Sequence, residues 1–336
     1  MPSKTLPEGK LPIRVLKTIL RSLPQGNMLV SPQVGIDVGV SKARGKYLVS
    51  SSDPITGTKA SMGWHAVNVS ANDVATCGIM PDELNIVALF PTGTTAIAVQ
   101  KVISEISDTA SGLGITVAGG HTEITPGLKR PIITVTAIGS GNSFVTAKDA
   151  KQFDSILMTK TAGIEGSSIL AKLPKVRKIV GSITSRKGAA LLKQLSILKE
   201  ARIAFKSGRV HAMHDVTEGG ILGAVYEMSL ASNLGFEIYR DSIPIDDSTR
   251  MICAKLSIDP IKLIGSGSLL IACSSNSSRM ITSRLESQGI RATAIGRFLP
   301  PKKGRTLKEN EGEVRVTEAS IQDELWDALR KYGNLS

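Results

Sequence analysis

The feature that most constrains the fold of this chain is an alternation of short apolar segments with amphipathic helical stretches, which runs through the sequence twice. The first series ends near residue 138, and the second begins with the apolar segment 155–159. Small and polar residues interrupt the pattern between 139 and 153, as is typical of a connection between domains. A chain of 336 residues also exceeds the usual size of a single core. We therefore expect an α+β protein with two domains, 1–150 and 151–310, followed by a C-terminal helix within 311–336.

The spacing of apolar residues predicts the individual elements. In the first half we expect helices at 12–23, 61–76 and 95–113, and strands at 34–40, 47–51, 84–90, 115–118 and 131–138. In the second half we expect helices at 167–173, 188–206, 218–232, 277–288 and 320–331, and strands at 155–159, 236–239, 269–273 and 292–296.

Composition is that of an ordinary globular protein. Hydrophobic residues make up 41% and charged residues 21%, which allows a sizeable core. No apolar run reaches the roughly 20 residues that a membrane-spanning helix needs, and residues 1–10 lack the apolar segment of a secretory signal. Cys77, Cys253 and Cys273 lie far apart and form no C-x-x-C pair, which argues against a disulfide framework and a structural zinc site. We expect a cytoplasmic protein with buried thiols and no membrane partner.

Charge favours anionic ligands. Lysine and arginine outnumber aspartate and glutamate by 41 to 29, which gives a net charge of +12 and attracts polyanions. Only 4% of residues are aromatic, which is poor for stacking on bases, so nucleic acid is not the expected partner. The basic stretches 172–178 and 302–305 leave a polyanion-binding scaffold as the non-enzymatic alternative, although such runs are more often solvated surface.

A first cluster is acidic and consists of Asp37, Asp53, Asn72 and Asp73. Magnesium prefers such hard oxygen ligands, usually one or two carboxylates together with phosphates and water. Taken singly, Asp53 before Pro54 is also good turn chemistry, and Asn72 or Asp73 could be a polar helix face or cap. Asn72 and Asp73 stand in an otherwise apolar helical stretch, however, and buried acids need partners such as a metal.

A second cluster, Gly119-Gly120-His121-Thr122-Glu123, follows a predicted strand. Paired glycines let backbone amides approach a phosphate closely, and Glu123 could add a metal oxygen. A simple turn at the end of the strand is the alternative. His121 could donate to a phosphate or bind metal, but a lone histidine is more often structural.

A third cluster, Asp215-Val216-Thr217-Glu218-Gly219-Gly220, opens a predicted helix whose free amides suit anions. Asp215 and Glu218 are candidates for acid–base catalysis, and a simple N-cap is the alternative. His211 and His214 lack the i, i+4 spacing of a zinc-protease helix. The glycine-rich stretch 265–268 could form an amide nest, with a flexible turn as the alternative, and is expected to be a pocket wall. P-loop, dinucleotide-binding and hydrolase-elbow motifs do not occur.

In this order the clusters resemble the aminoimidazole-ribonucleotide-synthetase-like superfamily, which includes HypE, thiamine-monophosphate kinase and selenophosphate synthetase. The likeness runs over nearly the whole chain and is greatest to archaeal HypE-related proteins. It rests on the stretches 35–37, 51–56, 67–75, 119–123, 213–220 and 266–270.

The resemblance implies a fold and a chemistry. The N-terminal domain strands would pair two copies into a shared barrel, and a C-terminal α/β domain would pack beside an ATP cleft. ATP with magnesium would activate an amide, carbonyl or phosphate oxygen of a small molecule or of a partner protein's side chain, as in an ATP-dependent ligase or transferase. A small-molecule kinase is the alternative enzyme.

Three sets of residues are expected to form the site. The metal ligands would be Asp37, Asp53, Asn72, Asp73 and Glu123; the ATP contacts would come from Gly119, Gly120, Thr122, Thr217, Gly219 and Gly220; catalysis would fall to Asp215, Glu218 and His121.

Three departures from HypE accompany the likeness. The chain ends Lys331-Tyr332-Gly333-Asn334-Leu335-Ser336 without a terminal cysteine, so cyanide-forming chemistry on such a thiol is not expected. The Gly-Asp-Thr of HypE is replaced by residues 120–122, which leaves Glu123 as the nearby acid. The Asp-Asp-Ala-Ala of many relatives is reduced to one acid, Asp37, at residues 36–39.

Overall fold

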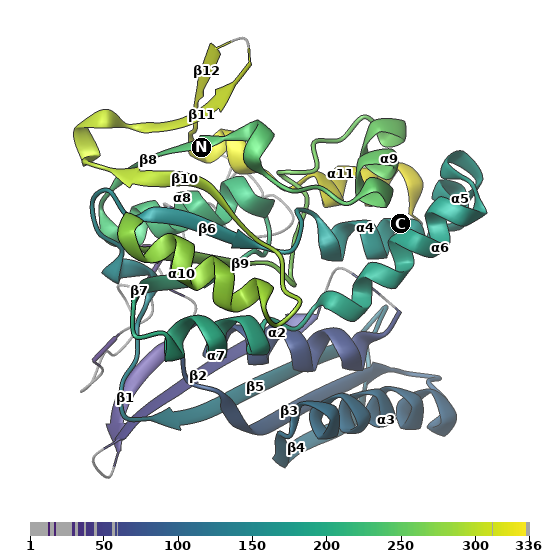
Figure 1. The fold of residues 1–336 in the computed structure, drawn as a ribbon. Coiled ribbons are helices and arrows are strands. Elements are labelled where there is room, and N and C mark those ends of the chain that lie inside the picture. The colour runs from purple at the N-terminus through teal and green to yellow at the C-terminus, as the bar shows by residue number, and fades with distance from the viewer. Residues whose placement is uncertain are drawn as a thin grey trace, which may run out of the picture. The chain divides into compact units, whose positions relative to one another are not determined.

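A computed structural model describes residues 60–310 and 312–333, together with 13, 17, 29–30, 33–36, 38–43, 46–55 and 58 (Figure 1). The chain divides into two compact units, which are treated separately. The N-terminal unit comprises Gly26–Ser31 and Asp37–Phe144, and the C-terminal unit comprises Met1–Gln25, Pro32–Ile36 and Val145–Ser336. The predicted helix at 12–23 lies outside the described residues except for Ile13 and Lys17, which are helical.

The N-terminal unit is built on a five-stranded sheet with the order β1-β2-β5-β3-β4. Its strands are antiparallel except for the parallel pair β3 and β4, which the helix α3 connects. The helix α2 packs on one face of the sheet, and α3 packs against α2. The elements are β1 (Gly39–Ala43), β2 (Lys46–Ile55), α2 (Met62–Thr76), β3 (Pro81–Pro91), α3 (Ala96–Leu113), β4 (Thr116–Thr125) and β5 (Ile132–Gly141).

Side-chain alternation gives this sheet two unlike faces. Val49, Ser51 and Ile55 of β2 are buried, whereas the residues between them are exposed or half-buried. Ile133, Val135 and Ala137 of β5 are fully buried on the same side. We call this side the α2 face and the other side, which no described element of the unit covers, the open face.

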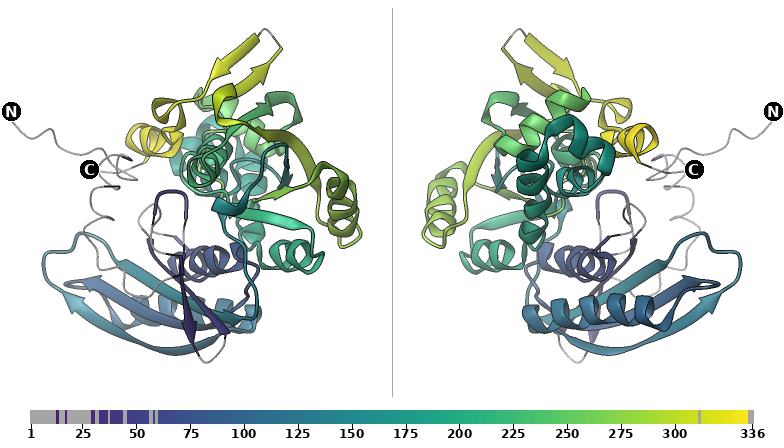
Figure 2. Two further views of the ribbon diagram at one scale, coloured as in Figure 1. Left: turned by 90° about the vertical axis from the view of Figure 1, so that its left-hand side faces the viewer. Right: turned by 90° about the vertical axis from the view of Figure 1, so that its right-hand side faces the viewer.

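The C-terminal unit is built on a seven-stranded sheet with the order β12-β11-β8-β10-β6-β9-β7. Its strands are β6 (Ser155–Thr159), β7 (Val210–Asp215), β8 (Gly235–Tyr239), β9 (Leu269–Cys273), β10 (Ala292–Leu299), β11 (Arg305–Glu309) and β12 (Gly312–Arg315). Figure 2 shows the hairpin of β11 and β12 extending beyond the rest of this sheet. Every residue of β9 is buried, as expected for a strand covered on both faces.

Helices surround the central strands of this second sheet. They are α4 (Ile164–Ala171), α5 (Pro174–Val180), α6 (Ser182–Ala190), α7 (Leu198–Lys206), α8 (Gly220–Ser232), α9 (Asp247–Leu256), α10 (Ser275–Glu286) and α11 (Glu324–Tyr332). Leu325, Ala328 and Leu329 of α11 pack into the same core as residues of α4 and α9. The last helix is therefore an integral part of the C-terminal unit.

The mixed α+β class is confirmed, and two element predictions are wrong. Residues 34–36 form a turn closed by a bridge between Gln33 and Ile36 rather than part of a strand. The single helix expected at 188–206 is broken between α6 and α7 by the 3₁₀ turn Leu191–Gln194. Lys160 lies against this break, where its ammonium donates to the carbonyls of Gln194 (2.8 Å) and Ser196 (2.7 Å).

The three cysteines are buried thiols, as expected. Burial raises the pKa of both Cys253 and Cys273 to about 12, so these two thiols stay protonated and unreactive at neutral pH. Among the described residues, no helix has the length and apolarity needed to cross a membrane.

Candidate functional site

Asn72 and Asp73, predicted inside a helix, lie on α2 and are buried there. Asn72 has no exposed surface and Asp73 keeps 4%. The hydroxyl of Ser51 on β2 donates to Oδ2 of Asp73 (2.6 Å), which fixes that carboxylate against the sheet. Three residues before Asp73 on α2, the hydroxyl of Ser70 donates to the carbonyl of Val135 on β5 (2.8 Å). These bonds tie α2 to two neighbouring strands at the level of its polar residues.

Asp53 lies on the same face of the sheet. It is two residues beyond Ser51 on β2, so both side chains point toward α2. Asp53 is half-buried and pairs directly with Val135, beside the hydrogen bond from Ser70. The α2 face thus gathers the carboxylates of Asp53 and Asp73 around two strands and one helix.

The glycine pair at 119–120 does not follow the end of a strand, as was expected from the sequence. It lies inside β4, which continues to Thr125 and pairs in parallel with β3. A Cβ at Gly120 would lie 2.1 Å from the carbonyl oxygen of Ile86, so glycine permits close strand pairing here. A glycine-rich sequence predicts a turn from local preference, but the long-range pairing with β3 overrides that preference.

His121, Glu123 and Thr125 alternate along β4 and share one side of it. Nε2 of His121 lies 3.0 Å from Oε2 of Glu123, and the hydroxyl of Thr125 donates to Oε1 (2.6 Å). The hydrogen bond from Thr125, followed by that from His121, lowers the pKa of Glu123. All residues of β4 before Thr125 are exposed.

Strand register places this trio on the open face. Asp53, Val135, Ile86 and Gly120 pair across four strands in one row, which lies on the α2 face. His121 belongs to the next row, so it and Glu123 point to the opposite side. Within one N-terminal unit, Glu123 therefore does not face the carboxylates of Asp53 and Asp73, whereas Thr122 lies on their side.

Asp37 lies outside the described residues, so its place relative to the other acids is a prediction from sequence alone. Over the part of the chain that the structure describes, no three acidic, histidine or cysteine side chains form a group that could hold a metal by themselves. Any cation on the α2 face would therefore need oxygen ligands beyond Asp53 and Asp73.

In the C-terminal unit the predicted motif 215–220 connects β7 to α8. Asp215 ends the strand and has no exposed surface, and its carbonyl accepts from Nδ1 of His214 (2.6 Å). The carbonyl of Thr217 accepts from the amides of Gly220 (3.1 Å) and Gly265 (3.3 Å). The glycine-rich stretch 265–268, which contains a turn, is thus hydrogen-bonded to the motif.

Lys160 also binds the stretch 265–268. Its ammonium donates to the carbonyl of Gly267 (2.9 Å) and forms an ion pair with the buried Glu200. Burial lowers the pKa of Lys160, and the charge of Glu200 opposes that shift. Sequence analysis did not single out Lys160, because its partners lie far along the chain.

Gly219 and Gly220 are both required by geometry. Their φ angles are +84° and +63°, and a Cβ would lie 2.6 Å from the carbonyl oxygen of Ile321 and 2.5 Å from that of Ile261, respectively. The sharp turn they make starts α8 without a side-chain cap. The amide of Gly219 instead donates to Oδ2 of Asp323 (2.7 Å).

The N-terminal part of α11, with its N-cap Asp323, therefore contacts the motif directly. Besides the bond between Asp323 and Gly219, Nε1 of Trp326 donates to Oε1 of Glu218 (2.7 Å). Desolvation first, and then the charges of Glu218 and Glu165, raise the pKa of Asp323 to about 7, against two backbone hydrogen bonds that lower it. Only the N-cap role of Asp323 could be anticipated from sequence, since Asp before a helix is a common cap. Its bond to Gly219, 104 residues away, could not.

Comparison with known proteins covers most of the chain. Residues 35–140 match the family described as AIR synthase related protein, N-terminal domain, and residues 154–308 match its C-terminal domain. A putative hydrogenase expression/formation protein of Methanocaldococcus jannaschii is 28% identical over 223 residues, which cover 65% of this chain and 64% of that protein. The chain thus spans just under two thirds of that relative.

Two further likenesses concern HypE. Carbamoyl dehydratase HypE of Escherichia coli is 25% identical over 281 residues, or 80% of this chain and 81% of that protein. A crystal structure of the hydrogenase maturation protein HypE in complex with ATP is similar with a TM-score of 0.69 and 19% identity, covering 82% of this chain and 87% of that one. The structural likeness establishes a shared fold.

Proposed function

The chain belongs to the AIR synthase related protein family, and from that premise we propose that it is an enzyme that uses ATP with magnesium to activate an oxygen of its substrate. The oxygen would be that of an amide, carbonyl or phosphate group. The observation that carries the proposal is that Asp53 of β2 and Asp73 of α2 lie on one face of the N-terminal sheet, where Ser51 donates to Asp73. The relatives named HypE, one of them in complex with ATP, support it.

The ligand atoms available on the α2 face are of the type that magnesium prefers. Asp53, Asp73 and the amide oxygen of Asn72 are hard ligands, and magnesium commonly binds one or two carboxylates together with substrate phosphates and water. Asp53 and Asp73 would hold that cation, with Asp37 as a further ligand, and the bound cation would neutralise charge that develops on the phosphates.

The loop from Asp215 to Gly220 would position the reacting group. Asp215 is buried, and Trp326 orients Glu218, so both carboxylates are held in place as acid–base catalysis requires. The amides at Gly219 and Gly220 open a helix of 13 residues, where phosphate oxygens are stabilised. Because Asp323 accepts from Gly219, an anion can bind this amide only after the Asp323 carboxylate moves aside.

The open face of the N-terminal sheet is the proposed contact between two copies of the chain. Leu48 and Val87 are 37% and 42% exposed on it, and the face continues over Ile138 of β5. These apolar side chains stand beside hydroxyls such as those of Ser52 and Thr136, which bond to each other, and an uncovered face of this mixed kind suits contact with another protein. His121 and Glu123 would then act from the dimer interface rather than share a cation with Asp53 of their own N-terminal unit.

The acceptor would be a small molecule or a side chain of a partner protein, in a cytoplasmic setting. Product analysis of MgATP turnover tests the reaction. Phosphorus NMR that shows free phosphate appearing together with ADP would support activation of an oxygen that is then displaced. A phosphorylated product without free phosphate would instead indicate a small-molecule kinase, and no ATP consumption with any acceptor would contradict both enzymes.

A further inference from the structure

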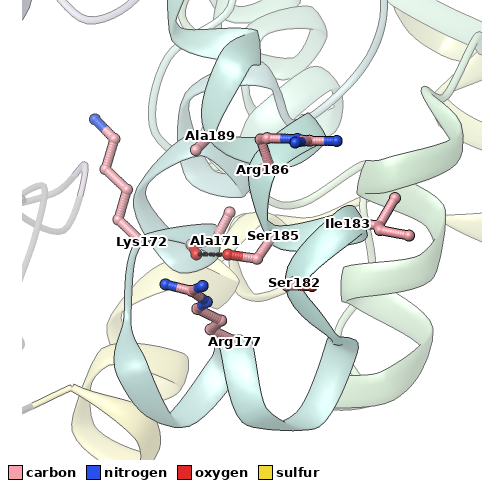
Figure 3. A pocket seen from close by; sticks show the side chains of 8 residues that line it. All are labelled: Ala171, Lys172, Arg177, Ser182, Ile183, Ser185, Arg186 and Ala189. Carbon is pink, nitrogen blue, oxygen red and sulfur yellow. Dashed lines mark hydrogen bonds between the residues drawn. The ribbon is translucent and has the colours of Figure 1, made fainter.

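A hollow of about 430 Å³ lies in the C-terminal unit among the end of α4, α5 and α6. Its wall includes Lys172, Arg177, Ser182, Ile183 and Arg186 (Figure 3). A second hollow of about 400 Å³ adjoins it and shares Lys172, Arg177 and Ser182. Volumes of this order are typical of sites for small molecules.

All charged side chains in the walls of the two hollows are positive. Neither hollow has an acidic residue in its wall. Residues 166–199 contain no aspartate or glutamate at all. The same stretch contains the basic residues Lys172, Lys175, Arg177, Lys178, Arg186, Lys187, Lys193 and Lys199. Like charges repel one another, so a concentration of this kind is stabilised when an anion binds.

Two arginines reach the hollow from different helices. Arg177 lies in the last turn of α5 and Arg186 on α6. Figure 3 shows the guanidinium of Arg177 below the hydrogen bond from Ser185 to the Ala171 carbonyl, with Arg186 above it. Lys172 extends away on the other side, so it contributes charge rather than a direct contact. Guanidinium groups suit phosphate because their fork of N–H donors matches two oxygens.

The walls of the hollow are fixed. Ser185 is buried and donates to the carbonyl of Ala171 (2.7 Å), which ties α6 to α4. Gly188 lets the helices approach closely, since a Cβ there would lie 2.7 Å from Cδ1 of Ile252 and 3.0 Å from Cβ of Ala171. Gly181, with φ +84°, makes the sharp turn from α5 into α6. A site held in this way needs little reorganisation to bind a ligand.

The wall also offers uncharged donors and apolar surface. The helix α6 begins at Ser182 without a side-chain cap. The first amides of a helix have no hydrogen-bond acceptor within that helix, so they can donate to a ligand. Ile183 is 64% exposed and stands next to Ser182. The combination therefore suits a phosphate group that carries a small apolar part better than it suits a bare inorganic ion.

We propose that this hollow binds the phosphate group of a small phosphate ester, through Arg177, Arg186 and the start of α6. Its residues are other than Asp53 and Asp73 and other than those of the loop at 215–220. It takes the phosphate as a ligand and needs neither magnesium nor ATP turnover. The proposal therefore stands independently of the proposed enzymatic function.

Calorimetric titration with phenyl phosphate, in a low-salt buffer free of phosphate and magnesium, tests the proposal. The chain should bind phenyl phosphate more tightly than inorganic phosphate, which lacks the apolar part. The double variant Arg177→Gln/Arg186→Gln should bind at least about tenfold more weakly, as expected when two charge-assisted contacts are lost. The matched variant Lys187→Gln/Lys193→Gln loses the same charge from the same stretch and should bind within about twofold of the original chain.

Several outcomes would overturn the proposal. Equal weakening in both double variants would show a response to net charge alone. Loss of phenyl phosphate binding in Asp53→Asn would place the ligand at the carboxylate site instead. Absence of phenyl phosphate binding, together with binding of a DNA duplex that falls steeply with salt, would indicate nucleic acid. A chain that binds phenyl phosphate as expected but never binds MgATP would contradict only the proposed enzyme.

Discussion

Oδ2 of Asp323 accepts a hydrogen bond from the backbone amide of Gly219 at 2.7 Å. A carboxylate just before α11 is thus the hydrogen-bond partner of the amide at the start of α8. The same carboxylate caps its own helix through the amide of Leu325 (2.7 Å). A negative charge at a helix start is favourable, but desolvation and the neighbouring acids Glu218 and Glu165 oppose it. The pKa of Asp323 is therefore about 7, so its carboxyl group changes between the neutral and the charged form near neutral pH.

Stability should fall as pH rises because of Asp323. Its pKa is about 7 in the folded protein and 3.8 in a model compound, so the folded state binds more protons between these values and the free energy of unfolding declines through that window. The slope from one proton is at most about 1.4 kcal/mol per pH unit. Asp323→Asn keeps an acceptor for Gly219 and should lack this slope. Denaturant unfolding from pH 4.5 to 8 measures it; parallel curves for the two proteins would contradict the assignment.

Gly220→Ala should unfold the loop between β7 and α8. The φ of +63° is strained for alanine, and the added Cβ would meet the carbonyl oxygens of Ile261 (2.5 Å) and Leu263 (2.8 Å). Gly208→Ala is a matched control, because its φ is +68° but nothing lies within 4 Å of its Cβ. We expect a loss of about 1 kcal/mol for Gly208→Ala, the order of the backbone strain, and a clearly larger loss for Gly220→Ala. Equal shifts of the melting temperature would disprove the close approach.

Lys160→Met should destabilise the C-terminal unit strongly. The change removes the donor to three carbonyls and leaves Glu200 buried without its cation, a situation that costs about 3–5 kcal/mol. The double variant Lys160→Met/Glu200→Leu removes the stranded charge and should recover part of that loss. Hydrogen exchange should quicken first at residues 265–268. A double variant no more stable than the single variant would argue against the ion pair.

Val87→Arg should separate two copies of the chain if the open face is their contact. The new charge would stand on a face where the side chain is 42% exposed in one unit but would be buried between two, which is unfavourable for an unpaired charge. Sedimentation should report a monomer for Val87→Arg and a dimer for both the original chain and Ser107→Arg, which changes an exposed position of α3. A dimer that persists in Val87→Arg would place the contact elsewhere.

Sequence reasoning succeeded where local pattern decides structure. The helix that carries Asn72 and Asp73 was predicted at 61–76 and spans Met62–Thr76, because its apolar spacing and its lack of breakers agree. The cluster at 119–123 was expected to follow the strand 115–118, since glycines favour strand ends locally, whereas pairing with the parallel neighbour β3 holds them inside a strand. Periodicity along one strand gives a face for each residue, but only the register across strands shows that Glu123 and Asp53 lie on opposite faces.

Contacts between distant segments could not be predicted from the sequence. Lys160 donates to carbonyls more than 30 residues away, at the point where the helix expected at 188–206 is interrupted. Asp323 reaches Gly219 across 104 residues. Both cases depend on a charged or polar side chain that satisfies backbone groups in another part of the fold, and no local pattern encodes such a pairing.

The central claim is that Asp53 belongs to a site for a nucleotide with magnesium, and calorimetry with the non-hydrolysable analogue AMP-PNP tests it most directly. The original chain should bind the analogue only when magnesium is present. Asp53→Asn should weaken that binding by at least about tenfold, the loss expected when a metal loses a carboxylate ligand. Ser52→Ala, which changes the neighbouring residue on the open face, should leave it unaltered. Binding that is equal in Asp53→Asn and the original chain, or absent from both, would contradict the account.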